Sequence, residues 1–250
     1  MIDLEMIRAG LDSSEFFLEY LPIVSIEPER CVGAEALLRW QRPEGVVFPD
    51  DFVPLTENTP LSGLLTYWVI DRVAIEMGDW LRKQDGVELH INVPPEILGR
   101  GGLEYAAQKS GLSDVRHKLV MEITERGVPD QLGLRALDLA ARQGIRIALD
   151  DVRIDPASVM VLSRSNVQII KIDKSVLLDT GVSVGVAMPR WAEALSVLLK
   201  TTDLEVIAEG VETAEQASML RAAGVQRAQG HYFSPSLRVK AFLHYYRQHS

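Results

Sequence analysis

The chain of 250 residues has room for one large α/β domain or two small ones, and 47% hydrophobic content supplies an ample core. A net charge of −9 argues against a nucleic acid polymer or an anionic membrane as the default partner. The single cysteine, Cys31, excludes an internal disulfide and suits a reducing compartment. Since no apolar run approaches the ~20 residues that span a bilayer, we expect a cytoplasmic protein or module, with further domains allowed in a longer parent chain.

Hydrophobic periodicity predicts strands that alternate with helices along most of the chain. A short helix at 2–11 precedes two strands, 16–24 and 32–40, which should be antiparallel because their connection is too short for a parallel crossover. Further strands are expected at 88–93, 118–124, 145–150, 168–172, 205–210 and 227–233. Further helices are expected at 59–81, 102–110, 129–143, 156–163, 186–200, from the capping box at 213–216 to Gly224, and at 236–247.

This order of elements predicts the fold class. Eight extended segments, six of them separated by helices, with no linker and no internal repeat, favour one α/β domain over residues 1–250, folded as a (β/α)8 barrel. The alternative is a doubly wound open sheet. We rank it second because it would place a glycine-rich phosphate loop after a strand, and the chain contains no Gly-x-Gly-x-x-Gly.

Polar side chains interrupt or end several of the apolar strands. Acids or amides occupy six such places: Glu35, Asn92, Glu122, Asp150, Asp151 and Glu209. Only one matching strand offers an ammonium, that of Lys171. Because one lysine cannot neutralise so many buried acids, we infer a divalent metal site. For any single acid an ion pair with an arginine is an equally good explanation, but their common placement favours the metal.

The residue types point to phosphoester chemistry. Strand side chains alternate between faces, so these acids can share the barrel mouth at the carboxyl ends of the strands. Oxygen ligands select hard cations such as Mg²⁺ or Mn²⁺. The neighbours Asp150 and Asp151 can serve two ions, an arrangement used for in-line attack on phosphoesters. Lys171 and Arg39 would then address water or phosphate oxygens.

A series of short motifs also runs in order along the chain. Glu35-Ala36-Leu37, followed by Leu38-Arg39-Trp40, is the first of them. The others are found at 52–57, 92, 122–125, 150–151, 170–173, 208–213 and 229–230. Together they cover roughly residues 5–248, and in this order they closely resemble the EAL domains, the cyclic di-GMP phosphodiesterase family.

The resemblance implies a TIM-like (β/α)8 barrel with an antiparallel first strand, which hydrolyses cyclic di-GMP to linear pGpG with two Mg²⁺ or Mn²⁺ ions. One ion would be held by four matched residues, of which Asp150 would bridge to a second ion held also by Asp151 and Glu209. These metal ligands are implied by the resemblance: Glu35, Asn92, Glu122, Asp150, Asp151 and Glu209.

The resemblance also assigns roles to the remaining matched residues. Glu209 is similar to the general base, and Lys171 to the group that holds the nucleophilic water. Arg39 resembles the contact to the substrate phosphate, while Glu212 and Gln229 resemble the outer wall of the substrate site. Two further acids would lie just outside the ligands: Glu125, which resembles the acid that steadies the loop after Asp151, and Asp173.

The chain departs from the family pattern after the acidic pair. The usual Asp-Asp-Phe-Gly-Thr-Gly is replaced by a loop, 152–156, that reads Val-Arg-Ile-Asp-Pro. Because both glycines are lost, a backbone with positive φ is penalised there, and we expect low or partner-gated turnover. Pro94 and His231 also stand where a serine and a tyrosine are usual. None of these changes removes a residue matched to a metal ligand.

Two alternatives stay open. The altered 152–156 loop motivates a non-catalytic cyclic di-GMP receptor or signalling module. A barrel glycosidase or aldolase is the third choice, but Lys171 beside several acids should keep its proton, which argues against a Schiff base. A homodimer and a sensory or regulatory domain or protein are the further partners that we keep open.

Overall fold

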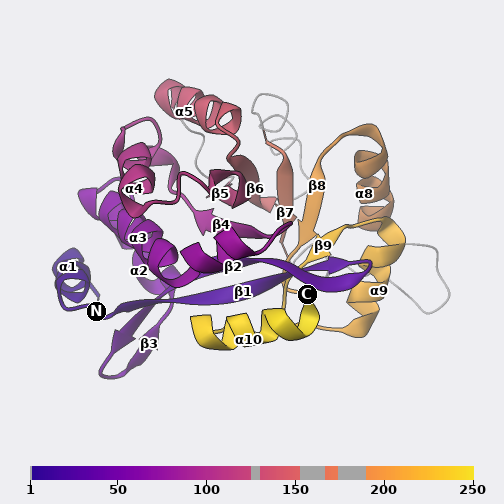
Figure 1. The fold of residues 1–250 in the computed structure, drawn as a ribbon, viewed down its shortest axis with the longest axis horizontal. Coiled ribbons are helices and arrows are strands. Elements are labelled where there is room, and N and C mark those ends of the chain that lie inside the picture. Colours follow the sequence, from indigo (N-terminus) through magenta and orange to yellow (C-terminus); the bar gives the residue numbers. More distant parts are fainter. Residues whose placement is uncertain (1, 125–129, 153–166, 174–189) are drawn as a thin grey trace.

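The strands of the chain close into a barrel surrounded by helices, as a computed structural model shows (Figure 1). The structure describes residues 2–124, 130–152, 167–173 and 190–250. In these ranges the strand order is β1-β9-β8-β7-β6-β5-β4-β2-β3, and an additional pairing of β1 with β2 closes the ring, leaving β3 outside it. The strands are β1 (Phe16–Ile26), β2 (Glu29–Arg42), β3 (Gly45–Val47), β4 (Glu88–Asn92), β5 (Leu119–Thr124), β6 (Arg146–Val152), β7 (Ile169–Ile172), β8 (Glu205–Ala208) and β9 (Arg227–Ala228).

The expected TIM-like (β/α)8 barrel is therefore confirmed, and the open doubly wound sheet is wrong. β1 is antiparallel to both neighbours, β2 and β9, whereas the neighbours from β2 through β4 to β9 are parallel. The short turn between β1 and β2 imposes this exception, because it leaves no room for a crossover helix.

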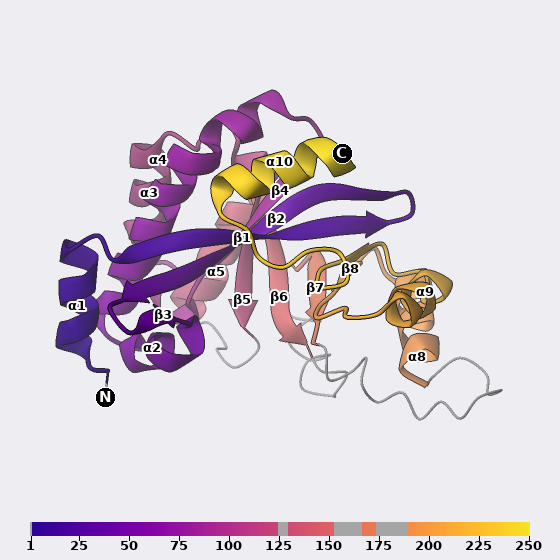
Figure 2. The ribbon, with the colours of Figure 1, turned by 90° about the horizontal axis from the view of Figure 1, so that it is seen from below.

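Helices cover the outside of the ring (Figure 2). They are α1 (Leu4–Asp12), α2 (Pro49–Thr56), α3 (Pro60–Lys83), α4 (Gly102–Ser110), α5 (Gln131–Arg142), α8 (Arg190–Thr201), α9 (Ala214–Ala223) and α10 (Val239–His249), with 3₁₀ turns η1 (Pro95–Ile97) and η2 (Arg116–Lys118). The helix expected at 156–163 lies outside the described residues. Among the helices that are described, none combines the length and the apolar character that a bilayer crossing requires.

Two local differences from the expectations have clear causes. α2 is absent from the expected elements because Pro54 lies inside it. Pro49 at its first turn and the two acids that follow nevertheless favour a helix start there. The strand expected at 227–233 ends at Ala228, because Gly230 adopts φ 148°. A Cβ at Gly230 would collide with the backbone of Val211, so only glycine fits there.

α10 seals the side of the barrel where β1 and β2 form the long hairpin (Figure 2). The Phe242 ring lies 5.9 Å from that of Tyr20 on β1 and 5.4 Å from that of Trp80 on α3. The latter is an edge-on contact, which aromatic rings prefer to a face-to-face sandwich. This packing ties the C-terminal helix to the first strand and to the long helix α3.

Four charged side chains close the amino-terminal end of the barrel, each from the first residue of a strand. Arg146 on β6 contacts Glu88 on β4 at 2.5 Å and Glu205 on β8 at 2.9 Å. Arg227 on β9 contacts the same two carboxylates. Burial alone would raise the pKa of Glu88, but His90 and the two arginines hold it well below its usual range. We call these four residues the floor ring; its two acids and two arginines balance one another.

The floor ring should contribute measurably to stability. Replacement of Glu88, whose side chain is 14% exposed, by glutamine leaves two arginines facing one acid and should lower the free energy of unfolding by about 3 kcal/mol at pH 7. Because the folded pKa of Glu88 is depressed, this contribution is complete above the unfolded value of about 4.3 and is lost as the pH falls below it.

Urea unfolding of the wild type and of Glu88→Gln between pH 7 and about pH 3 measures both effects. Glu104→Gln, at an exposed position on α4, is the matched control and should change stability by no more than about 0.5 kcal/mol. Two results would contradict the role of the floor ring: an equal loss of stability in Glu88→Gln and Glu104→Gln, or a stability difference between wild type and Glu88→Gln that grows toward acid pH.

Candidate active site at the carboxyl ends of the strands

Four carboxylates converge on one buried ammonium at the barrel mouth. Lys171 on β7 is 0% exposed, and the acids come from β2, β5, β6 and the residue that follows β8. From Nζ the distances are 3.0 Å to Glu35 Oε2, 2.9 Å to Glu122 Oε1, 3.1 Å to Asp150 Oδ1 and 2.7 Å to Glu209 Oε1. Strand alternation turns these side chains into the barrel near the carboxyl ends of their strands, where all four carboxylates meet around Lys171 Nζ.

One positive charge does not satisfy four negative ones in this buried place. Burial would lower the pKa of Lys171, but the surrounding carboxylates raise it well above its ordinary value, so the ammonium persists. Burial raises the pKa of Glu122 to about 7, and burial with the charges of Asp150 and Glu35 raises that of Glu209 well above its usual range. The cluster therefore carries an excess of acid groups and favours further positive charge.

Two side-chain amides organise the cluster. Asn92 Nδ2 donates to Glu35 Oε1 at 2.9 Å, and Gln229 Nε2 donates to Glu35 Oε2 at 2.7 Å and to Glu209 Oε1 at 2.8 Å. Although burial opposes ionisation of Glu35, Lys171 and these amides lower its pKa to about 2. Glu35 is thus held in its ionised form, and Gln229 fixes its distance from Glu209.

The oxygens of the cluster fit a hard cation. Glu122 Oε2 and Gln229 Oε1 are buried and have no hydrogen-bond partner in the described part of the chain. A buried polar atom left in this way costs about 1–3 kcal/mol, so it calls for a ligand. Within the described ranges no three acid, histidine or cysteine side chains form a ready-made metal cage; the Lys171 ammonium lies among the carboxylates instead. The all-oxygen donor set is the kind that Mg²⁺ and Mn²⁺ bind.

A cleft of about 980 Å³ leads to the cluster and is lined in part by Asn92, Glu122 and Asp150. Arg39 lies on its wall: Nε donates to Glu19 Oε2 at 3.0 Å and Nη1 to the Leu38 carbonyl at 2.9 Å. The guanidinium also lies 5.0 Å from the ring centroid of Phe48, which is 54% exposed. This aromatic ring is therefore presented to the cleft beside a fixed cation.

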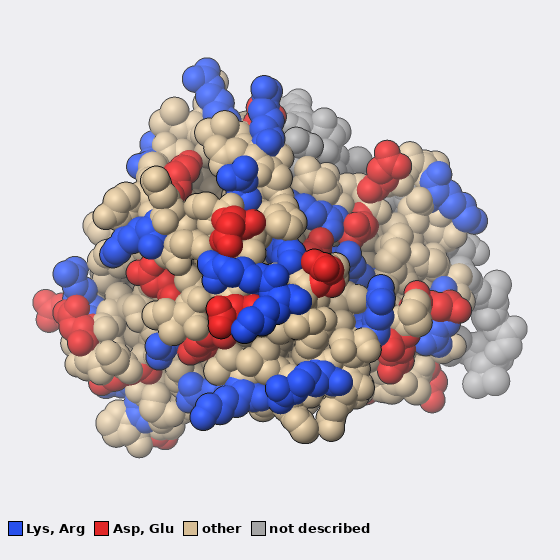
Figure 3. Space-filling view, in the orientation of Figure 1, with Lys and Arg blue, Asp and Glu red and all other residues tan. Residues whose placement is uncertain are grey.

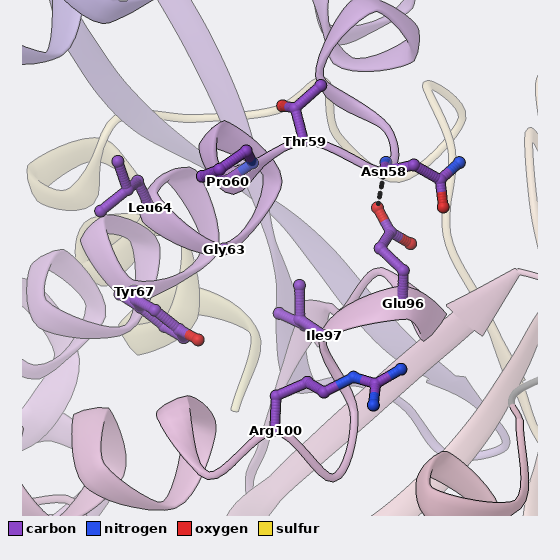
Figure 4. Close-up of a pocket in the computed structure, with 9 residues that line it drawn as sticks. All are labelled: Asn58, Thr59, Pro60, Gly63, Leu64, Tyr67, Glu96, Ile97 and Arg100. Carbon is purple, nitrogen blue, oxygen red and sulfur yellow. Dashed lines mark hydrogen bonds between the residues drawn. The ribbon is translucent and has the colours of Figure 1, made fainter.

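A second pocket, of about 630 Å³, lies at the start of α3 (Figure 4). Asn58, Glu96 and Arg100 line both this pocket and the cleft. Glu96 accepts from the Asn58 backbone N–H at 3.3 Å and from Ser62 Oγ at 2.8 Å, while Arg100 pairs with Asp130 at 2.8 Å. Its polar rim is thus internally satisfied, in contrast to the acid cluster.

The structure brings together most of the residues that the sequence indicated. The cluster contains Glu35, Asn92, Glu122, Asp150, Lys171, Glu209 and Gln229. Arg39 lies at the cleft, but it is already paired with Glu19. Glu212 is exposed at the start of α9, where its backbone N–H donates to Gln216 at 2.7 Å. No contact joins Glu212 to the cluster within the described residues.

Three other expected residues are less well defined. Asp173 directly follows β7 and is half-buried. Asp151 belongs to β6, but its side chain lies outside what the structure describes. Glu125 and most of the altered 152–156 loop also fall outside the described ranges.

Sequence reasoning missed two residues near the cluster. His90 is 0% exposed, and its Nδ1 lies 2.7 Å from Glu122 Oε1. Burial would lower the pKa of His90, but Glu122 and Glu88 raise it. One signal was available in the sequence: Glu88, His90 and Asn92 alternate with apolar residues, which indicates that His90 shares a strand face with Asn92. Phe48 had none, because its place in the cleft depends on how β3 and α2 fold back onto the barrel.

Charge on the surface does not point to another site. Figure 3 shows acidic and basic side chains interspersed over the face of the molecule that it presents. The net charge of −9 is therefore not gathered into one acidic patch on that face.

Comparisons with known proteins agree with this geometry. The sequence model of the family described as EAL domain matches residues 4–236. "Probable cyclic di-GMP phosphodiesterase PdeB" of Escherichia coli (strain K12) is 32% identical over 251 residues, covering 97% of this chain and 47% of the relative. "Uncharacterized protein Rv1354c" of Mycobacterium tuberculosis (strain ATCC 25618 / H37Rv) is 32% identical over 250 residues, covering 97% of this chain and 40% of the relative. The chain thus spans less than half the length of these two curated relatives.

Solved structures show the same relationship. The EAL enzyme Bd1971, in its cAMP- and cyclic-di-GMP-bound form, superposes with a TM-score of 0.84 at 26% identity, covering 97% of this chain and 67% of that one. The PaMucR phosphodiesterase in complex with c-di-GMP gives 0.83 at 26% identity, covering 96% and 98%. On the family match and the shared barrel, this chain belongs to the EAL domain family.

Proposed function

We propose that this chain is a metal-dependent phosphodiesterase that hydrolyses cyclic di-GMP to linear pGpG. The observation that carries the proposal is the convergence of four carboxylates on Lys171 at the head of a cleft. Family membership and relatives named as cyclic di-GMP phosphodiesterases support it. Because the 152–156 loop lacks the glycines usual in the family, we propose that turnover is low or gated by a partner.

The cluster would hold two Mg²⁺ or Mn²⁺ ions, which bind phosphate oxygens and make a bound water more acidic. The first would take Glu35, Asn92, Glu122 and Asp150, and the second Asp150, Asp151 and Glu209. Asn92 and Gln229 keep Glu35 oriented, so little rearrangement is needed on its side of the site. The carboxylates that now face the ammonium of Lys171 would turn partly toward the ions.

Two residues are suited to move or hold protons at the attacking water. Glu209 lies beside the Lys171 ammonium and accepts from Gln229 Nε2 at 2.8 Å, so its carboxylate is held where it would accept the proton of the water. Lys171 keeps its proton and lies 2.7 Å from Glu209, so its ammonium can hold the oxygen of that water by donation.

The cleft would receive the cyclic dinucleotide. Its volume of about 980 Å³ lies at the upper end of the range for small-molecule sites. Arg39 keeps donors that its bonds to Glu19 and Leu38 do not use, and these would contact a phosphate. Phe48 exposes a flat apolar ring at the cleft, which suits it to stack on a guanine base.

A non-catalytic receptor is the second candidate, on the observation of the altered 152–156 loop. It predicts tight binding of cyclic di-GMP in calorimetry without any product. If the loop alone prevents turnover, replacing residues 152–155 by Phe-Gly-Thr-Gly should restore cleavage. Because the curated relatives are longer than this chain, we also propose that the barrel works with a sensory or regulatory domain. A homodimer is a separate proposal, which the length of the relatives does not address.

Hydrolysis is tested with the purified chain in excess over cyclic di-GMP and with Mn²⁺ or Mg²⁺, by chromatographic detection of pGpG. We expect product with either metal and none after chelation. Glu209→Gln keeps the shape of the side chain but removes the base, and should slow the reaction by about 10²- to 10⁴-fold. Glu215→Gln, at an exposed position on α9, should leave the rate unchanged. Binding without product would favour the receptor, and the absence of both would overturn the proposal.

Stacking by Phe48 is tested by steady-state kinetics. Loss of one base–aromatic contact, worth about 1–3 kcal/mol, should raise the KM of Phe48→Ala by roughly 5- to 150-fold. We expect kcat to stay nearly constant, because the ring is part of the binding wall and not of the acid cluster. Phe48→Tyr should behave like the wild type, and Val46→Ala on the exposed strand β3 is the control. An unchanged KM in Phe48→Ala would exclude the contact.

A further inference from the structure

β4 carries an unusual inward face. Glu88, His90 and Asn92 alternate with the outward apolar residues Leu89 and Ile91, so the polar side of this strand faces the barrel. Glu88 belongs to the floor ring and Asn92 to the acid cluster. His90 lies between these two charged levels, with Nδ1 on the side of Glu122 and Nε2 on the side of Glu88.

The interior between these two charged levels is otherwise apolar. A buried cluster inside the barrel takes one residue from each of six strands, β1, β2, β5, β6, β7 and β8: Ile23, Val32, Val120, Ala148, Ile169 and Ile207. β4 contributes no member to this cluster. Burying the polar imidazole of His90 in such surroundings costs free energy, which an apolar side chain would avoid.

The two ring nitrogens of His90 have different contacts. Nδ1 lies 2.7 Å from Glu122 Oε1, within hydrogen-bond distance. Nε2 has no hydrogen-bond partner among the described residues; the nearest carboxylate oxygen, Glu88 Oε2, is 3.7 Å away and is already bound by Arg227. Since a carboxylate that binds a cation is ionised and only accepts, Nδ1 would be the donor to Glu122 in the metal-bound site. The specific contact of the ring is therefore the one toward the acid cluster.

This contact decides which oxygen of Glu122 stays available. The ammonium of Lys171 contacts the same oxygen, Oε1, at 2.9 Å. Both donors thus lie on Oε1, and Glu122 Oε2 stays buried without a hydrogen-bond partner in the described part of the chain. A carboxylate held by one oxygen cannot rotate freely, so its other oxygen is presented in a fixed direction.

From this geometry we infer that His90 is a positioning residue, which donates from Nδ1 to Glu122 Oε1 and so presents Oε2 of the same carboxylate to a divalent cation. This inference rests on the metal site of the proposed function. A histidine kept only to fill the barrel would need no particular nitrogen, whereas this role depends on Nδ1 alone. Outer hydrogen bonds of this type typically change metal affinity by about 10- to 100-fold.

Two near-isosteric variants separate these roles. The amide nitrogen of asparagine can take the place of Nδ1, whereas that of glutamine takes the place of Nε2. Calorimetric titration of the metal-free variants with Mn²⁺ should therefore show a loss of affinity of about 10- to 100-fold in His90→Gln and a change of less than about threefold in His90→Asn. Thermal unfolding without metal checks that both variants fold.

The outcomes are distinct. Equal losses of affinity in both variants would show that the ring only fills space, and unchanged affinity in both would show that Glu122 needs no such donor; either result overturns the inference. If His90→Gln does not fold, His90→Asn decides alone, because a large loss of affinity in it contradicts the role of Nδ1. Wild-type protein that binds no Mn²⁺ would instead refute the metal site of the proposed function.

Discussion

The ammonium of Lys171 holds four carboxylates together at the mouth of the barrel, within 3.1 Å of each. Buried like charges at such distances repel strongly, so the arrangement depends on this central cation. The single charge is shared unequally: Glu35 stays ionised, whereas Glu122 and Glu209 have raised pKa values. The barrel therefore holds a cluster that is stable enough to form and still short of positive charge.

The two ends of the barrel use charge in different ways. In the floor ring two acids and two arginines balance, so this end needs no further ligand. At the mouth acids are in excess, and two buried oxygens lack hydrogen-bond partners among the described residues. The strands of the barrel carry the floor ring at one end and the acid cluster at the other, with an apolar layer between them. The balanced floor ring can therefore hold the strands rigidly while the acid cluster keeps oxygens that have no hydrogen-bond partner.

Much of this could be predicted from the sequence. Alternation in strands shows which residues share a face, and the carboxyl ends of parallel strands must meet, so Glu35, Glu122 and Asp150 could be assigned to one site in advance. His90 and Phe48 could not. A histidine in a strand is typical of a core residue unless the carboxylate that faces it is known. Phe48 directly precedes α2, a helix that was not predicted because it contains Pro54.

The order of strands, the antiparallel start and the membership of the acid cluster follow from the sequence alone, because they depend on periodicity, on the length of the β1–β2 connection and on the motifs. Only the tertiary structure decided which oxygen contacts which donor, how Arg39 is restrained by Glu19, and that His90 contacts Glu122 through Nδ1. These features depend on distances between strands that are far apart in the chain. Closure of the barrel sets those distances, and they cannot be read from the sequence.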